Sequence, residues 1–302
     1  MGIEKIAVAE ATPISDMVDV NVEFSAFVSP ANENPGFKRK IFDFFNVGIG
    51  SKISALVIDT HFLYWKLRHP GAKFSDYYAG RIADSLRRGG THKTLGDKAF
   101  LSGSLFSNAV KKSVETHQNR GKQYFNIAVN HGLEPHHSCI DYGSGSLRVG
   151  QHLINFLNAK KYWGIDIVSD FYEAGISLLQ PGTMELKNPR FDVISQATLE
   201  AIRLTKPDFI FSFAVLKHVP PDELDLYFRS IATMMAAHTI AVVTFNPSHN
   251  TLRTGGSIWN FRPEDLVRCI LSIDPNLKCS ITPKLEDTVK LPKIVAISIQ
   301  RV

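Results

Sequence analysis

A glycine-rich turn that follows an apolar strand is the stretch of this sequence best suited to hold a ligand. The strand runs up to Asp141, and the turn is Gly143-Ser144-Gly145. Glycine allows a positive φ and lets a ligand approach the backbone closely. After the turn, apolar residues recur at the spacing of one helix face, at Val149, Leu153, Ile154 and Leu157. Strand, Gly-x-Gly turn and helix in this order are typical of the first ligand pocket of a Rossmann-like sheet.

A carboxylate at the end of the next apolar stretch is the second candidate for chemistry. Asp166 closes the segment 162–166. An ionised carboxylate has two acceptor oxygens, so Asp166 could hold both hydroxyls of a nucleoside ribose. The dinucleotide fingerprint also requires a small residue three positions after the turn, where the helix approaches the strand, and this sequence has Arg148 there. NAD or FAD binding is therefore disfavoured, and an NAD-dependent oxidoreductase is kept as an alternative.

A histidine that follows the fourth apolar stretch could move a proton. His218 would lie at the carboxyl edge of a parallel sheet, where open α/β folds bind their ligands. Histidine titrates near neutral pH, which suits a general base. The alternative is that His218 only packs or caps the next helix. His136 and His137 are poor metal ligands if they start a strand, because a strand sends neighbours to opposite faces, and we expect no metal site.

Five apolar stretches separated by helical patterns must position these residues. The expected strands cover residues 137–141, 162–166, 191–195, 208–213 and 239–245, and helices are expected at 222–236 and 262–271. Segments 279–282 and 293–302 are expected to form a closing antiparallel hairpin. Continuous apolar strands alternating with helices indicate a sheet buried on both faces. The predicted fold class is α/β, a Rossmann-like doubly wound sheet, mostly parallel, with an antiparallel C-terminal hairpin.

The first part of the chain differs in charge from the rest. Residues 1–36 carry one Lys against six acids, and we expect a flexible acidic tail. Residues 37–122 carry 16 Lys and Arg against six acids. We expect residues 37–118 to form a helical basic extension or substrate lobe, with helices over 51–68, 76–88 (with Ser75 as N-cap) and 108–118. Another helix, over 121–132, should precede the first strand. The basic excess could meet an anionic partner such as nucleic acid, or could be an ordinary solvated surface.

The composition excludes several classes of protein. The whole chain has 302 residues, a net charge of +5, 44% hydrophobic and 21% charged residues, which is ordinary for a globular protein. No apolar run approaches the ~18 residues of a membrane span, and the start of the chain has no signal-peptide pattern. Its three cysteines are too few and scattered for a disulfide framework. We expect a cytoplasmic protein without a membrane span.

Three motifs together resemble those of the class I S-adenosylmethionine (SAM)-dependent methyltransferases. They are Ile140-Asp-Tyr-Gly-Ser-Gly-Ser-Leu-Arg148, Tyr162-Trp-Gly-Ile-Asp166 and Phe211-Ser-Phe-Ala-Val-Leu-Lys-His-Val219. They occur in the order of that family, and the resemblance covers about residues 119–302, which would be the SAM-binding methyltransferase domain. The Gly-Ser-Leu-Arg sequence after the turn is similar to a bacterial-type subgroup. The resemblance implies SAM as the cofactor.

The resemblance also implies a role for each matching position. The turn would contact the methionine end of SAM, through Asp141, Gly143, Ser144 and Gly145. The nucleoside would lie against Asp166, Ile167 and Gln196, with Asp166 on the ribose and Ile167 on the adenine. The transferring methyl group would lie beside Ser212 and Phe213. Two positions depart from the family pattern, because Gln196 replaces an acid and Ser144 replaces a Cys or Ala.

The sequence does not identify the acceptor of the methyl group. The sequence lacks the Asn/Asp-Pro-Pro-Tyr/Phe motif of amino methyltransferases acting on nucleic acid bases, so O-methylation of a small molecule or a sugar or glycan is preferred. The alternatives are an RNA methyltransferase that uses the basic extension, and a non-catalytic SAM-binding subunit. The loop 246–262, with Trp259, Phe261 and Arg262, could close over the substrate. The oligomeric state is not predicted.

Overall fold

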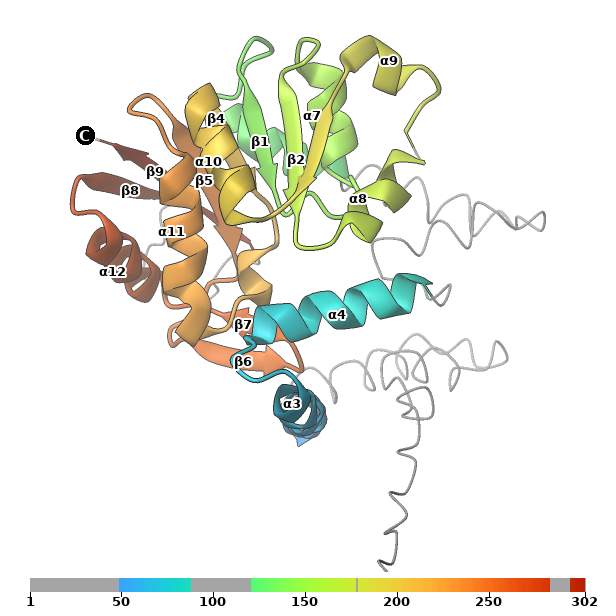
Figure 1. Cartoon of the computed structure of the whole chain (residues 1–302). Coiled ribbons are helices and arrows are strands. Elements are labelled where there is room, and N and C mark those ends of the chain that lie inside the picture. Colours follow the sequence, from blue (N-terminus) through green and yellow to red (C-terminus); the bar gives the residue numbers. More distant parts are fainter. Residues whose placement is uncertain (1–48, 88–120, 178, 283–293, 302) are drawn as a thin grey trace, which may run out of the picture.

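The centre of the protein is a mixed β-sheet, with five parallel strands at one side and two antiparallel strands at the other edge (Figure 1). The computed structural model describes residues 49–87, 121–177, 179–282 and 294–301. Within these residues a seven-stranded sheet has the order β3-β2-β1-β4-β5-β9-β8. Its strands are β1 Cys139–Tyr142, β2 Tyr162–Asp166, β3 Arg190–Val193, β4 Phe209–Ser212, β5 Ile240–Phe245, β8 Leu277–Thr282 and β9 Val295–Arg301. β1 to β5 pair in parallel and β9 is antiparallel to β5 and β8, which confirms the predicted fold class.

Helices cover both faces of this sheet because successive strand residues point to opposite sides. On β4, Ile210 packs in one apolar cluster, whereas Phe209 and Phe211 pack in the other. The first cluster lies under α10 Gln196–Thr205, α11 Leu224–Met234 and α12 Pro263–Ile273. The second lies under the helical residues 121–130, α7 Gly150–Phe156 and α8 Ser169–Ile176. The short α9 Thr183–Lys187 precedes β3.

The predicted bounds of the strands agree with the structure to within a few residues. The predicted bounds of the helices around them agree about as well. The strand predicted at 137–141 starts at Cys139, because residues 134–137 form a turn before it. The predicted helix 222–236 is confirmed as α11, preceded by the 3₁₀ turn η3 Pro221–Glu223. The predicted helix before β1 is helical over residues 121–130, and Gly132 ends it at φ +93°.

A small group of elements that we call the cap lies at the carboxyl edge of the parallel strands. The cap consists of α3 Ile49–Arg68, α4 Phe74–Arg87 and the hairpin of β6 Leu252–Gly255 and β7 Ile258–Asn260. Figure 1 shows α4 crossing below the ends of β1 and β2, with the hairpin beside it. The prediction of a loop over 246–262 was therefore wrong in its secondary structure, because an ordered hairpin occupies most of that range.

One arginine ties the three parts of the cap together. Arg253 of β6 forms an ion pair with Asp59 of α3, at 2.6 Å. Its guanidinium lies 5.0 Å from the ring centre of Trp259 and 5.9 Å from that of Phe74 on α4. The Phe74 and Trp259 rings meet edge to face at 5.2 Å. The hairpin is thus bound to both helices by charge and by aromatic contact.

Helix α4 starts earlier than predicted, because a residue far away in the sequence binds its first N–H groups. Ser75 is not the N-cap, since the helix begins one residue earlier. The backbone N–H of Phe74 donates to the buried carboxylate of Glu223 at 2.7 Å, and the N–H of Ser75 also donates to it at 3.3 Å. A carboxylate is favourable at a helix N-terminus, so Glu223 fixes the place where α4 joins the core.

Parts of the predicted organisation lie outside the described residues. These are the acidic segment 1–36, the helix 108–118 and much of the basic segment, so the division into tail, extension and main domain stays a prediction. The predicted helix 51–68 is confirmed as α3. Among the described residues, no helix is both long and apolar enough to cross a membrane.

Candidate functional site

The glycine turn lies where the strand order reverses, between β1 and β4. In open α/β sheets, ligands bind at the carboxyl ends of the strands beside this point. Gly143 and Gly145 have φ of +80° and +52°. The N–H groups of Gly143 and Ser144 donate to the carbonyl of Ile165 at 2.7 and 3.1 Å. On the other side, a Cβ on Gly143 would lie 2.2 Å from Cγ2 of Val215. The turn is therefore packed between β2 and the segment that follows β4.

Two features of the turn would suit a bound ligand. Within the described part of the chain, a Cβ on Gly145 would come no closer than 4.0 Å to another atom, the oxygen of Gly143. The hydroxyl of Ser144 is buried and has no hydrogen-bond partner among the described residues. A buried hydroxyl without a partner is unfavourable. Open space at Gly145 and an unsatisfied hydroxyl beside it are what a polar ligand on this turn would fill.

Asp166 lies at the end of β2 and is tied directly to the turn. Its Oδ2 accepts from the N–H of Gly145 at 2.8 Å, and its Oδ1 accepts from the N–H of Ile167 at 2.8 Å. A carboxylate has about four lone-pair positions, so acceptor capacity remains for a ligand hydroxyl. Burial raises the pKa of Asp166 to about 6, although the backbone N–H groups lower it. Asp166 therefore remains ionised at neutral pH, close to the turn.

Asp141 is a second buried carboxylate, placed beneath the turn. Its Oδ2 accepts from the hydroxyl of Tyr162 at 2.7 Å, and burial raises its pKa to about 7. A Cβ on Gly150 would lie 2.6 Å from the Tyr162 oxygen and 3.2 Å from the Asp141 carboxylate. The small residue that lets α7 approach the sheet is thus Gly150. The sequence has Arg148 at the position expected for this small residue, and Gly150 takes that role two positions later.

The stability of the protein should depend on pH through Asp141. Its folded pKa of about 7 lies above its ordinary value of 3.8, so between these values the unfolded chain releases a proton that the folded chain keeps. Stability is then lost as the pH rises from about 4 to about 7. Asp141→Asn should remove up to ~4 kcal/mol of this loss. Urea unfolding of both proteins between pH 4 and pH 8 measures it, and an unchanged pH slope in the variant contradicts the assignment.

The end of β4 places Ser212 in the core and Phe213 in an aromatic stack. The hydroxyl of Ser212 is fully buried, donates to the carbonyl of Tyr142 at 3.0 Å and accepts from the hydroxyl of Tyr227 at 2.7 Å. Any contact of Ser212 with a cofactor must therefore come through its backbone. Phe213 stacks on Tyr124 with ring centres 4.2 Å apart, and the Arg148 guanidinium lies over both rings.

His218 lies in the 3₁₀ turn η2 Leu216–His218, directly after the segment that packs against Gly143. Its Nδ1 is 2.9 Å from the carbonyl oxygen of Ser257 in the cap hairpin. Because a carbonyl can only accept, Nδ1 carries the proton, and the neutral ring has its lone pair on Nε2. This is the tautomer that a proton acceptor requires.

Tyr78 of α4 belongs to the site and was missed by the sequence analysis. Its ring stacks on that of His218, with centres 5.1 Å apart and an angle of 20° between the planes. Burial and the negative charge of Asp166 raise the pKa of Tyr78 above its ordinary value, while Arg81 lowers it. Tyr78 therefore contacts the histidine and lies close enough to Asp166 to be affected by its charge, which brings α4 of the cap to the site. A tyrosine in a helix far from the motifs gave no local signal of this.

The other predicted positions lie further from this centre. Ile167 is 36% exposed next to Asp166, and Gln196 is an exposed residue at the start of α10, after β3. Both residues lie at the carboxyl edge, where a ligand would bind. Their contacts with the adenine stay predictions. Glu134, His136 and His137 form a cluster of potential metal ligands, but it precedes β1 and so lies at the opposite edge of the sheet.

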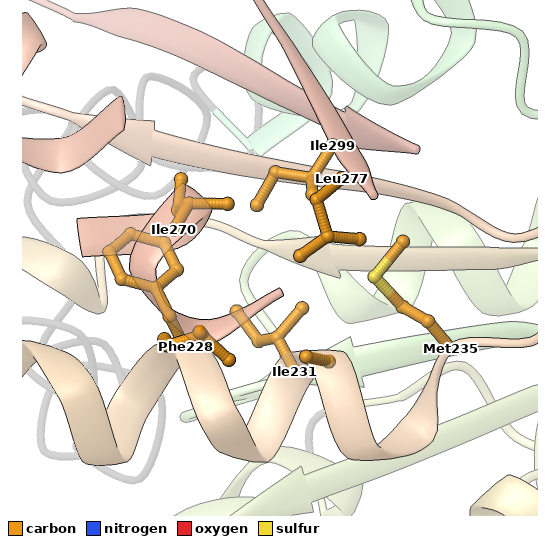
Figure 2. Close-up of a pocket in the computed structure, with 8 residues that line it drawn as sticks. Phe228, Ile231, Met235, Ile270, Leu277 and Ile299 are labelled. Carbon is orange, nitrogen blue, oxygen red and sulfur yellow. The ribbon is translucent and has the colours of Figure 1, made fainter. Parts of the chain in front are cut away.

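An apolar crevice elsewhere in the molecule has no part in this site. Figure 2 shows it between α11, α12 and the β8–β9 hairpin, with Phe228, Ile231 and Ile270 among its lining side chains. It offers no room for a water molecule, and all of its lining residues are apolar. We regard it as a packing feature of the helix layer.

Together, the fold and the site define a Rossmann-like protein with a glycine turn and a buried carboxylate at its switch point. No protein-family model matches this sequence, and no curated protein is significantly similar to it.

Solved structures with a similar arrangement include three methyltransferases. The magnesium protoporphyrin IX methyltransferase of Synechocystis PCC 6803 with bound SAM has a TM-score of 0.49 at 16% identity, covering 77% of this chain and 99% of that one. A SAM-dependent methyltransferase of Clostridium acetobutylicum has a TM-score of 0.45 at 11% identity, covering 64% and 99%. A glycopeptide N-methyltransferase complexed with sinefungin has a TM-score of 0.45 at 7% identity, covering 60% and 94%. We base the functional assignment on the geometry of the site.

Proposed function

We propose that this chain is a SAM-dependent methyltransferase. The observation that carries the proposal is the turn at the switch point, where the unsatisfied hydroxyl of Ser144 and the open face of Gly145 lie beside the buried carboxylate of Asp166. The turn would hold the methionine end of SAM and Asp166 the ribose. Ile167 and Gln196 would border the adenine, with Phe213 and the backbone of Ser212 near the transferring methyl group.

The chain's own contribution is to bind, orient and exclude water. When bound, SAM supplies a methyl group that its sulfonium makes electrophilic. The protein must hold the acceptor in line with that methyl group, and correct positioning can contribute ~7–11 kcal/mol to lowering the barrier. The cap lies over the carboxyl edge and is bound to the core through Glu223 and His218, so it would shield the acceptor from water.

His218 would take the proton from the acceptor hydroxyl, because the Ser257 carbonyl fixes the ring proton on Nδ1 and a neutral imidazole with its proton there is basic at Nε2. His218→Ala should lower kcat by ~10²–10⁴-fold, the usual size of a general-base contribution. Affinity for SAM should stay within about twofold, since the turn and Asp166 are untouched.

The matched control for this prediction is His238→Ala. His238 lies before β5 at the other edge of the sheet, beside Asp208. Turnover and SAM binding are measured for both variants between pH 5 and pH 9. Near-normal turnover of His218→Ala at neutral pH excludes the base role.

The acceptor is proposed to be a hydroxyl of a small molecule or glycan. An RNA acceptor is a second candidate, because residues 37–122 carry 16 Lys and Arg against six acids. Incubation with methyl-labelled SAM and fractionated cell extract distinguishes them. Label in a small-molecule or glycan fraction supports the first, and salt-sensitive labelling of RNA supports the second. Bound SAM without transfer to any fraction favours a non-catalytic subunit.

A further inference from the structure

Helix α3 has two opposite apolar faces, of which the protein's described residues cover one. Ile58, Phe62 and Trp65 face the core of the sheet and the cap. On the opposite side, five large side chains are exposed, namely Ile53, Leu56, Leu63, Tyr64 and Leu67, at 49%, 66%, 66%, 41% and 77%. We call these five residues the outer face of α3. A helix that is apolar all round is normally covered on all sides.

Four of the five outer-face residues are spaced symmetrically about Thr60, and Leu63 lies beside this stripe. The positions 53, 56, 60, 64 and 67 follow one another at intervals of three, four, four and three residues. Rotation about a two-fold axis through Thr60 therefore places Ile53 opposite Leu67 of a second helix, and Leu56 opposite its Tyr64. An isologous dimer requires a surface that is complementary to itself in this way. Intervals of three and four residues are also those of helices that pack side by side along an apolar seam.

We propose that the outer face of α3 binds the same face of a second copy of this chain, as an antiparallel helix pair centred on Thr60. Taking the ~200 Å² of an aromatic side chain as the upper value for these residues, the exposed fractions amount to at most ~600 Å² per copy. The pair would bury at most ~1,200 Å², which reaches the lower range of specific interfaces. An apolar patch of this size lies at the upper end of what a monomer exposes. Asp59 and Lys66 lie along one flank of the outer face and would form a polar rim there.

This arrangement would join two caps back to back. α3 contacts both α4 and β6 within the cap, and α4 carries Tyr78 at the site. The inference does not depend on SAM binding, since it rests on α3 alone.

The first test is the mass of the full chain in solution by sedimentation equilibrium. We expect wild-type protein at twice the 33.7 kDa chain mass. Leu56→Asp and Leu63→Asp should each yield the monomer. The matched control is Leu204→Asp, which alters a leucine that is 68% exposed on α10, and this variant should remain dimeric. A monomeric wild-type protein overturns the proposal and means that something other than a second copy covers the outer face.

The second test fixes the geometry of the pair by disulfide crosslinking. In an antiparallel pair, Thr60→Cys brings two thiols together at the axis, within the 4.4–6.8 Å Cα separation of a disulfide. Leu67→Cys puts the two thiols ~21 Å apart along the helix, given a rise of ~1.5 Å per residue. Mild oxidation should therefore crosslink Thr60→Cys and not Leu67→Cys, above the background of wild-type cysteines.

Two crosslinking results would contradict the proposal, each in a different way. Crosslinks at both positions indicate a parallel pair. No crosslink at Thr60→Cys, in a variant whose circular dichroism matches wild type, shows that the two-fold axis does not pass through this residue.

Discussion

Asp166→Ala is expected to weaken SAM binding by at least ~100-fold. An ionised carboxylate that accepts hydrogen bonds contributes ~1.5–3 kcal/mol per bond, and Asp166 would accept from two ribose hydroxyls. The substitution also removes the acceptor of the Gly145 N–H, which holds the turn against β2 at 2.8 Å. Affinity is measured by calorimetric titration at pH 7.5, where the pKa of about 6 leaves Asp166 ionised.

The matched control for Asp166 is another acid of the same edge. Asp170 lies four residues further on, in α8, and its nearest cationic partner is Arg87 at 3.9 Å. Asp170→Ala should bind SAM within about threefold of wild type. If Asp166→Ala binds SAM as tightly as wild type, with an unchanged thermal midpoint, the ribose assignment is wrong.

Gly143→Ala is expected mainly to lower the stability of the protein, and Gly145→Ala mainly to weaken SAM binding. A methyl group at Gly143 would lie 2.2 Å from Val215, on a backbone with φ of +80°. Strained φ and overpacking together should lower the free energy of unfolding by ~2–4 kcal/mol. A methyl group at Gly145 meets open space at φ +52°, so it should reduce stability by only ~1 kcal/mol. It should nevertheless weaken SAM binding ~10-fold or more, because it projects into the ligand's place.

The two glycines act as controls for each other. Urea unfolding and calorimetric titration are carried out on both variants. A Gly145→Ala protein that is nearly as stable as wild type and still binds SAM normally contradicts the placement of the ligand on this turn. Equal destabilisation by both variants contradicts the difference in packing.

The sequence predicted the parts of the site that depend on local pattern. The strand before Asp141, the positive φ at Gly143 and the carboxylate at the end of β2 follow from apolar spacing and from the properties of glycine. These residues lie within one βαβ unit, so neighbours in the sequence are also neighbours in space. His218 was placed at the correct edge for the same reason, since it directly follows a parallel strand.

The parts that were missed depend on contacts between distant segments. Tyr78 stacks on His218 only because the buried Glu223 supplies the first hydrogen bonds of α4, and no pattern near Tyr78 reveals that pairing. The β6–β7 hairpin is short and depends on Arg253 and Trp259 contacting the cap helices. The outer face of α3 was also not predicted. A helix with two apolar sides has no single apolar face in its sequence pattern, so the pattern does not show which side is exposed.

The most direct test of the central claim is calorimetric titration of the full wild-type chain with SAM and, separately, with NAD⁺. The site geometry predicts one SAM per chain with micromolar or tighter affinity, loss of that binding in Asp166→Ala, and no measurable heat with NAD⁺. Absence of SAM binding, or binding of NAD⁺ that Asp166→Ala abolishes, would contradict the assignment of the turn to SAM.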